Sequence, residues 1–139
     1  MNMPRAGRPQ LPEPVEAKLT ADWIKLQYAL RNGDATDDLI WVVDLMNELV
    51  DSNPTECLRV IERIATIDKS EFIAASLGAG PVEDVMRLHG RSILPQIEMR
   101  AAADENLRRT LGGVWIHTVP EDLRERWSRL VGPGNRSGA

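Results

Sequence analysis

The sequence predicts an all-α protein, arranged as a compact antiparallel helical bundle of about seven or eight short helices. Apolar residues recur every three or four positions through residues 15–131, and no segment alternates polar and apolar residues as a half-buried strand does. Glycine, proline and asparagine interrupt this pattern at short intervals, so consecutive helices should be joined by tight turns and pack as antiparallel neighbours. A short HEAT-like stack of helical hairpins is the alternative arrangement, although we find no sequence repeat.

The chain of 139 residues has the usual size of one domain, and its 42% of hydrophobic residues can build a core. We place a single α-helical domain at residues 15–131. Four prolines within residues 1–14 restrict the backbone to extended conformations, which predicts a flexible Pro-rich tail. The last segment, GPGNRSGA, predicts a second flexible tail over residues 132–139.

Start and stop signals set the bounds of the predicted helices. Asn32-Gly33 ends the first one, because glycine accepts the left-handed conformation of a C-cap. Asn53-Pro54 begins the third with a capping residue and a proline at the first helical position. Asp68 and Glu71 have the spacing of a capping box at the start of the fourth. The expected ranges are 15–30, 36–52, 54–67, 68–78, 81–90, 92–103, 104–111 and 120–131.

Apolar faces predict which side of each helix is buried. On the first helix this face is formed by Leu19, Trp23, Leu26 and Leu30. The third helix is the most clearly amphipathic, and its polar face is formed by Glu56, Arg59, Glu62, Arg63 and Thr66. The single cysteine, Cys57, lies in an apolar stripe, so we expect a small buried hydrophobe without a disulfide. Trp115, in GGVWIHTV, is expected to close the core; the alternative is that it anchors a partner from a glycine hinge.

The second helix carries the first candidate binding surface. Asp44, Glu48 and Asp51 lie on one polar stripe, opposite the apolar one. Ile40 and Trp41 flank this stripe, and they are either covered by a neighbouring helix or exposed as a contact surface. The carboxylates fit a basic surface on a partner protein, with Trp41 as an additional contact.

The stretch GAGPVEDVMRLHG, residues 78–90, has the composition of a well-capped helix. Gly80 turns freely, and Pro81 fits the first helical position because its missing N–H has no intrahelical partner there. Glu83 and Asp84 fall in the first turn, where carboxylates interact favourably with the helix dipole. Glu83 and Arg87 are four residues apart, which favours an ion pair. We regard the edge formed by Glu83, Asp84 and Arg87 as a second candidate binding surface.

A catalytic interpretation of the same stretch makes Glu83 or Asp84 a general base and His89 an acid or a metal ligand. Asp84 and His89 point about 140° apart around a regular helix, which opposes this interpretation. It also requires His117, the other histidine, to fold beside His89. We therefore expect His89 to meet open carbonyl groups at the end of its helix, with Gly90 as the stop signal, and we assign no catalytic residue.

A weaker alternative is nucleic-acid binding through an Arg-rich helix near the C-terminus. The arginines concerned are Arg108, Arg109, Arg124, Arg126 and Arg129. The i,i+4 pairs Asp122–Arg126 and Glu125–Arg129 instead favour an internally paired, solvated face, with Trp127 on the apolar side.

Composition disfavours several classes of function. The formal net charge of −4 disfavours broad attraction to nucleic acid or to a membrane surface. No apolar run approaches the length of a membrane span, and the N-terminus lacks the apolar core of a signal peptide, so we expect a cytoplasmic protein. The sequence has no HxxxH, CxxC, GxxxxGK[ST] or GxGxxG pattern, and we expect neither a metal nor a cofactor.

Residues from about Phe72 to Trp115 resemble a family of small bacterial proteins classed only as a domain of unknown function. The shared features are the run from Ala79 to Asp84, His89-Gly90, Ile97-Glu98, Ala101, Leu111 and Val114-Trp115, together with the helix that starts at Asn53. The resemblance covers a third to a half of the chain and implies an all-α fold. It implies no activity, substrate or cofactor.

These observations lead us to expect a non-enzymatic helical protein-binding module, such as an adaptor, an immunity-type protein or an inhibitor-like protein. Its partner would be another protein, and its oligomeric state stays open. The alternatives are a small metal-dependent or acid/base hydrolase that uses His89 with Glu83 or Asp84, and the nucleic-acid binder described above.

Overall fold

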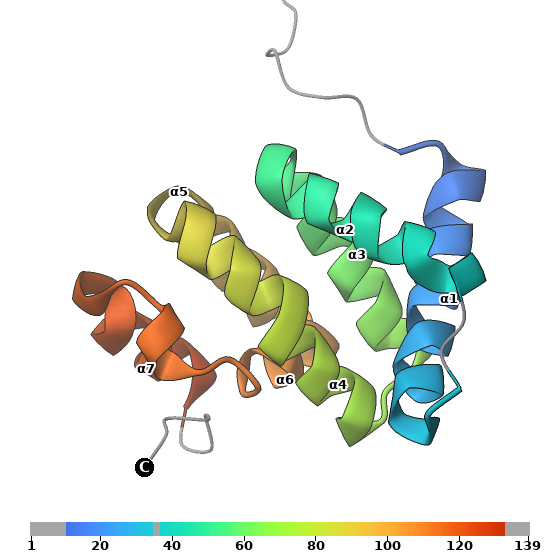
Figure 1. Ribbon diagram of the computed structural model, residues 1–139. Helices are drawn as coiled ribbons and strands as arrows, with labels where there is room; N and C mark the ends of the chain where they lie inside the picture. The colour runs from blue at the N-terminus through green and yellow to red at the C-terminus, as the bar shows by residue number, and fades with distance from the viewer. Residues whose placement is uncertain (1–10, 35–36, 133–139) are drawn as a thin grey trace, which may run out of the picture.

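The computed structural model describes residues 11–34 and 37–132, and it is all helical over these ranges (Figure 1). The α-helices are α1 (Glu13–Asn32), α2 (Ile40–Ser52), α3 (Pro54–Ile67), α4 (Glu71–Leu77), α5 (Glu83–Ala103), α6 (Glu105–Leu111) and α7 (Arg124–Val131). Short 3₁₀ turns, η1 (Asp37–Leu39), η3 (Ile116–Thr118) and η4 (Glu121–Leu123), complete the connections. The predicted all-α class is therefore confirmed. The parts of the predicted tails at 1–10 and 133–139 lie outside the described residues.

α4 and α5 are not separate helices. A π-helical turn, η2 (Gly78–Val82), joins them into one stretch over residues 71–103, so the described chain has fewer helical segments than predicted. The expected helix end at Gly78 is wrong because η2 continues the helix there, and the one at Gly90 is wrong because α5 runs on to Ala103. Gly90 is buried inside α5, and the interruption there is a kink at His89, where φ is −130° and ψ is 16°.

α3 lies at the centre of the bundle. It packs against α1, α2, α4, α5 and α6, while α1 and α7 occupy opposite ends of the molecule in Figure 1. A helix that contacts five others is typical of a compact bundle, whereas a linear repeat stack limits contacts to neighbours. None of the helices within the described ranges combines the length and hydrophobicity that a membrane span requires.

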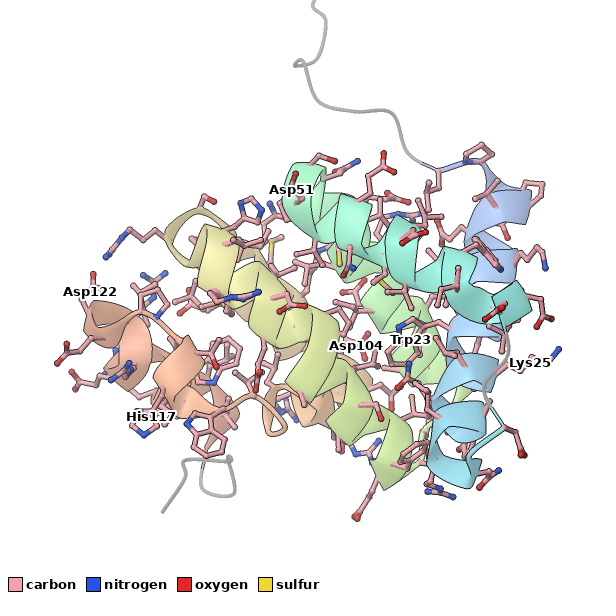
Figure 2. All side chains as sticks on the ribbon, viewed as in Figure 1. Trp23, Lys25, Asp51, Asp104, His117 and Asp122 are labelled. Atoms are coloured by element: carbon pink, nitrogen blue, oxygen red, sulfur yellow. The ribbon has the colours of Figure 1, made fainter. Side chains whose placement is uncertain are left out.

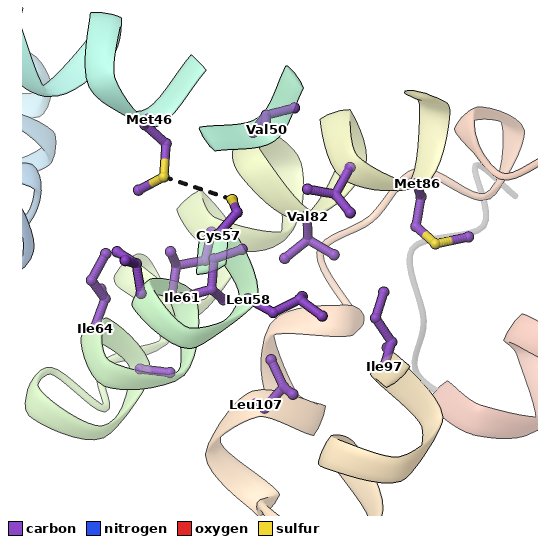
Figure 3. Close-up of a cluster of buried hydrophobic side chains, with 14 of the residues drawn as sticks. Met46, Val50, Cys57, Leu58, Ile61, Ile64, Val82, Met86, Ile97 and Leu107 are labelled. Atoms are coloured by element: carbon purple, nitrogen blue, oxygen red, sulfur yellow. Dashed lines mark hydrogen bonds between the residues drawn. The ribbon is translucent and has the colours of Figure 1, made fainter. Parts of the chain in front are cut away.

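The core surrounds the apolar side of α3 (Figure 3). Cys57, Leu58, Ile61 and Ile64 have no exposed surface, and the Cys57 thiol donates to Met46 Sδ at 3.9 Å. Burial raises the pKa of the Cys57 thiol to about 12, so this thiol stays protonated at neutral pH. Cys57 is thus a buried hydrophobe.

Trp115 and Leu30 were predicted to lie in the core, but they are exposed. Trp115 is 43% exposed and Leu30 is 57% exposed, whereas Trp127 is fully buried as expected. Trp115 precedes η3, and its backbone N–H donates to Glu83 Oε2 at 2.6 Å, so the segment is held by its backbone. Val114 is the buried residue of this segment.

Two of the predicted helix caps, at Gly33 and Asn53, are present. Gly33 adopts the left-handed conformation with φ of 78°, and the Asn53 side chain accepts from the Glu56 N–H at 3.3 Å. The predicted capping box at Asp68 is wrong. Ser70 caps α4 by accepting from the Ile73 N–H, because Asp68 instead receives hydrogen bonds from the Ser70 N–H and the Tyr28 hydroxyl.

The polar face of α3 is an inter-helix contact. Arg59 binds Glu16 Oε1 at 2.5 Å and Glu56 Oε1 at 3.1 Å, and both carboxylate side chains are at most 5% exposed. Arg63 binds Glu16 and Glu13 of α1. We call Glu13, Glu16, Glu56, Arg59 and Arg63 the α1–α3 ion cluster. The sequence pattern correctly predicts a polar face here, but not that it is covered by a second helix.

The pair between Glu98 of α5 and Arg126 of α7 predicts a pH-dependent stability. Two hydrogen bonds of 2.8 Å from Arg126 lower the pKa of Glu98 below its ordinary value of 4.5. A carboxyl with a lowered folded-state pKa stabilises the fold above the unfolded-state pKa, and this contribution is lost as pH falls through the folded-state pKa. Glu98→Gln should therefore lower the free energy of unfolding at pH 6 by roughly 0.5 kcal/mol, since both side chains are partly exposed.

Urea unfolding at pH 6 and pH 3 measures this effect. The difference between Glu98→Gln and the natural chain should shrink at pH 3. Glu125→Gln is the matched control, because Glu125 is 87% exposed and pairs within its own helix. Equal losses for Glu98→Gln at both pH values would contradict the prediction.

Candidate functional site

The exposed side of α2 carries three carboxylates at helical spacing. Asp44, Glu48 and Asp51 are all exposed, and Asp51 lies at the C-terminal end of the helix in Figure 2. None of the three side chains forms an ion pair or a hydrogen bond within residues 11–34 and 37–132. With Ile40, Val43 and Asn47, which are also exposed, they define what we call the α2 face.

Two of the three carboxylates of this face do not stabilise their own helix. Glu48 and Asp51 lie near the C-terminus of α2, and its last turn contains no basic residue. The C-terminal end of a helix is partially negative, so an exposed carboxylate there destabilises it by about 0.3–1 kcal/mol. Helix stability therefore does not explain why acidic residues occupy this position.

The side chain of His89 caps the C-terminal end of α2. Its Nε2 lies 2.8 Å from the carbonyl oxygen of Val50. The residue four positions beyond Val50 is Pro54, which has no N–H to donate, and His89 supplies the missing donor. We expected His89 to bind carbonyl groups at the end of its own helix. The carbonyl that it binds instead belongs to Val50, at the end of α2.

Trp41 lies beside the α2 face and is partly covered by α1. Its indole N–H donates to Asp22 Oδ2 at 3.3 Å, and Lys18 Nζ lies 5.4 Å from the ring centroid. Ile40 is 57% exposed. The sequence left open whether Ile40 and Trp41 are covered by a neighbouring helix or exposed. Trp41 is partly covered by α1, and Ile40 is exposed.

The second candidate surface divides into two contacts. Glu83 accepts from the backbone N–H of Trp115, whereas Asp84 pairs with Arg87 at 2.8 Å. The predicted Glu83–Arg87 pair is therefore wrong. Asp84 is three residues from Arg87 and pairs with it, while Glu83 is turned toward the segment before η3.

The structure does not bring the catalytic candidates together. The surface cavity beside His89 is lined by Arg87, Leu88, Gly90, Arg91, Ser92 and Pro120, and it includes neither candidate carboxylate nor His117. The ring of His117 lies 6.1 Å from that of Trp115, and Figure 2 places His117 near the C-terminal end of the fold. Within the described ranges, no group of three His, Cys, Asp or Glu side chains could hold a metal ion.

Most of the candidate nucleic-acid-binding arginines have protein partners. Arg126 binds Glu98, Arg129 binds Glu125 at 3.2 Å, and Arg124 donates to the carbonyls of Val119 and His117. Arg108 donates to the carbonyl of Ala101. The predicted Glu125–Arg129 pair is confirmed, but Asp122 pairs with Arg91 instead of Arg126.

A groove that sequence patterns did not indicate adjoins the α2 face. It is about 160 Å³ in volume and lies between α1, α2, α4, η2 and the start of α5. Pro81 explains why η2 is wide. Proline cannot donate within a helix and its ring clashes with the carbonyl four residues earlier. The wider turn is closed by a bond from the Glu83 N–H to the Gly78 carbonyl. Such π turns often occur at functional sites.

These features define a small all-α domain with an acidic helix face beside an apolar groove. Residues 29–132 match the Family of unknown function (DUF6869), and the chain belongs to this family. Neither the curated proteins nor the solved structures contain a match to the chain.

Proposed function

We propose that the protein is a non-enzymatic binding module that uses the α2 face to hold a basic surface of another protein. The observation that carries this proposal is the set of three exposed carboxylates at Asp44, Glu48 and Asp51, which have no ion-pair partner among the described residues. Their arrangement at i, i+4 and i+7 forms a continuous line along one side of α2.

Charge pairing elsewhere in the described chain supports this choice of surface. Eight of the lysine and arginine side chains form ion pairs with carboxylates, several of them between helices. Within residues 11–34 and 37–132 the α2 carboxylates lack such partners, and Glu48 and Asp51 also oppose the helix dipole. Residues that lower the stability of their own helix are typical of surfaces whose favourable contacts form on binding.

The partner should present lysine or arginine side chains beside an apolar patch. Ile40 and Val43 add exposed aliphatic surface at the N-terminal end of the α2 face. Apolar contacts at the centre of an interface supply most of its affinity, whereas complementary charges mainly accelerate and orient association. An adaptor, an immunity-type protein or an inhibitor-like protein would each act through such a surface. A cytoplasmic, bacterial setting belongs to this proposal.

The test is a variant that replaces Asp44, Glu48 and Asp51 with lysine. It should lose the partner protein captured by the natural chain from host lysate, as measured by affinity purification and quantitative mass spectrometry. It should also remain folded and gain roughly 0.5–1 kcal/mol in stability, because lysine near the C-terminus of α2 interacts favourably with the dipole. Lost binding together with increased stability separates a binding defect from unfolding.

A second variant controls for the change in total charge. Glu71, Glu105 and Glu121 are exposed carboxylates on other elements, without ion pairs within the described ranges. Replacing these three with lysine should leave the captured partner unchanged. Capture that survives the α2 substitutions, or that is lost equally in both variants, would exclude the α2 face as the binding surface.

A further inference from the structure

We infer that the groove beside the α2 face binds one aliphatic side chain of a partner segment that also carries lysine or arginine within one helical turn. This inference rests on the proposed function and deepens it, because it specifies the chemistry of the partner. The proposed ligand is a protein segment, not a small molecule or an anion.

The floor of the groove is apolar. Trp23 of α1, Met46 and Val50 of α2, and Pro81 of η2 line it, and all four residues are buried. The volume of about 160 Å³ lies below the roughly 300–1,000 Å³ of pockets that enclose whole small-molecule ligands. A single aliphatic side chain matches both the size and the lining. This anchor-in-pocket arrangement is typical of the residues that dominate protein–protein affinity.

The rim of the groove is suited to a polypeptide backbone. The side-chain amides of Gln27 and Asn47 line it, and neither forms a hydrogen bond within the described residues. A carboxamide can donate to a carbonyl and accept from an N–H, so these two groups can bind peptide units beside the anchor. The charged residue on the rim is Asp84, which makes a phosphate or carboxylate ligand unfavourable.

The groove is continuous with the unpaired carboxylates. Val43 and Asn47 belong to both the groove and the α2 face. Asp44 follows Val43 directly, and Glu48 lies one helical turn further along α2. A segment whose aliphatic side chain enters the groove therefore places its neighbouring side chains beside these carboxylates. Charge complementarity then selects lysine or arginine at those positions.

A random peptide display library tests this chemistry with the full chain as bait. Enriched sequences should contain an aliphatic residue within four positions of at least one lysine or arginine. The affinity of synthetic peptides with the enriched sequences would then be measured by fluorescence anisotropy for the natural chain and three variants.

Val43→Asn changes the groove without changing charge. Asp44→Asn with Glu48→Gln and Asp51→Asn removes the carboxylate charges. Val15→Asn is the matched control, since Val15 and Val43 are both 38% exposed.

We expect Val43→Asn to weaken peptide binding about tenfold, which corresponds to about 1.4 kcal/mol. Val15→Asn should leave the affinity unchanged. Neutralising the three carboxylates should weaken binding and reduce its salt dependence. In nitrogen-15 NMR spectra, the side-chain amide signals of Gln27 and Asn47 and the indole signal of Trp23 should shift during the peptide titration.

The outcomes separate this inference from the proposed function. Peptides that respond to carboxylate neutralisation but not to Val43→Asn, without shifts at Gln27, Asn47 and Trp23, would overturn the groove inference and leave the α2 face intact. Peptides insensitive to both variants would overturn both. A library that enriches no sequence, or only sequences without an aliphatic residue near a basic one, would also overturn the groove inference.

Discussion

Gly78→Ala is expected to lower the free energy of unfolding by about 3 kcal/mol. A methyl group at Gly78 would lie 2.2 Å from the carbonyl oxygen of Thr110 and 2.8 Å from the Cα of Gly113. Both contacts are with backbone atoms, so rotation of a side chain cannot relieve them. The 71–103 stretch must then move away from the end of α6 and the segment that follows it, which disturbs the buried residues between them.

Gly80→Ala is the matched control for this prediction. A methyl group at Gly80 would meet no atom of another element within 4 Å, and its φ does not lie in the left-handed region. Alanine there restricts the unfolded chain, which stabilises the fold, but a Cβ directly before Pro81 is disfavoured in a helical conformation, so the two effects oppose and the net change should stay within about 1 kcal/mol. Urea unfolding, followed by circular dichroism and tryptophan fluorescence, measures both variants. Equal and small effects would show that the Gly78–Gly113 contact does not limit the packing of the fold.

These two glycines therefore have different roles in the GAGPVED stretch. Gly78 permits close contact with Gly113 and does not end a helix. Gly80 lines the groove and gives η2 an open surface. Local patterns predicted Gly78 as a helix end, whereas the physical reason for this glycine is close contact between segments more than 30 residues apart.

Arg59→Met should be the second most damaging substitution, with a loss of roughly 2–3 kcal/mol. Arg59 is the partner that Glu16 and Glu56 share, and these side chains are 5% and 3% exposed. Removing one partner of a buried ion pair leaves an uncompensated charge, which commonly destabilises a protein by about 3–5 kcal/mol. Arg63 still pairs with Glu16, and Arg59 is itself partly exposed, so the expected loss is below this range.

Neutral substitutions provide the control for the ion cluster. Combining Arg59→Met with Glu16→Gln and Glu56→Gln removes the buried charges as well as their partner, and it should recover most of the lost stability. Thermal unfolding of Arg59→Met, of its combinations with Glu16→Gln or Glu56→Gln, and of the triple variant measures the coupling between Arg59 and the two carboxylates. A triple variant that is no more stable than Arg59→Met would show that Arg59 acts through packing of its methylene groups and not through its charge.

The α1–α3 ion cluster also has a consequence for domain organisation. Most of α1 (Glu13–Asn32) precedes the family match, which begins at residue 29. α1 is held on the family region by Leu19, Trp23 and Leu26 in the core and by the ion cluster at its N-terminal end. Because Trp23 and Gln27 line the groove, attachment of α1 completes the proposed binding site.

Local patterns predicted those features that depend on neighbouring residues in the chain. The caps at Gly33 and Asn53, the buried stripe of α3 and the all-α class follow from backbone conformation and 3.6-residue periodicity. The exposure of Asp44, Glu48 and Asp51 follows from the same periodicity. Asp68 departs from the prediction because a residue 40 positions away, Tyr28, binds its carboxylate.

The sequence by itself therefore determined the helical class, the helix caps at Gly33 and Asn53 and the acidic line along α2, since each of these depends on residues within a few positions of one another. Only the tertiary structure decided that His89 serves the carbonyl of Val50, that Arg59 links two buried carboxylates and that a groove opens beside Val43. Each of these depends on which helices pack together, because hydrogen bonds and ion pairs act over a few ångströms between residues that the chain separates by up to about 40 positions.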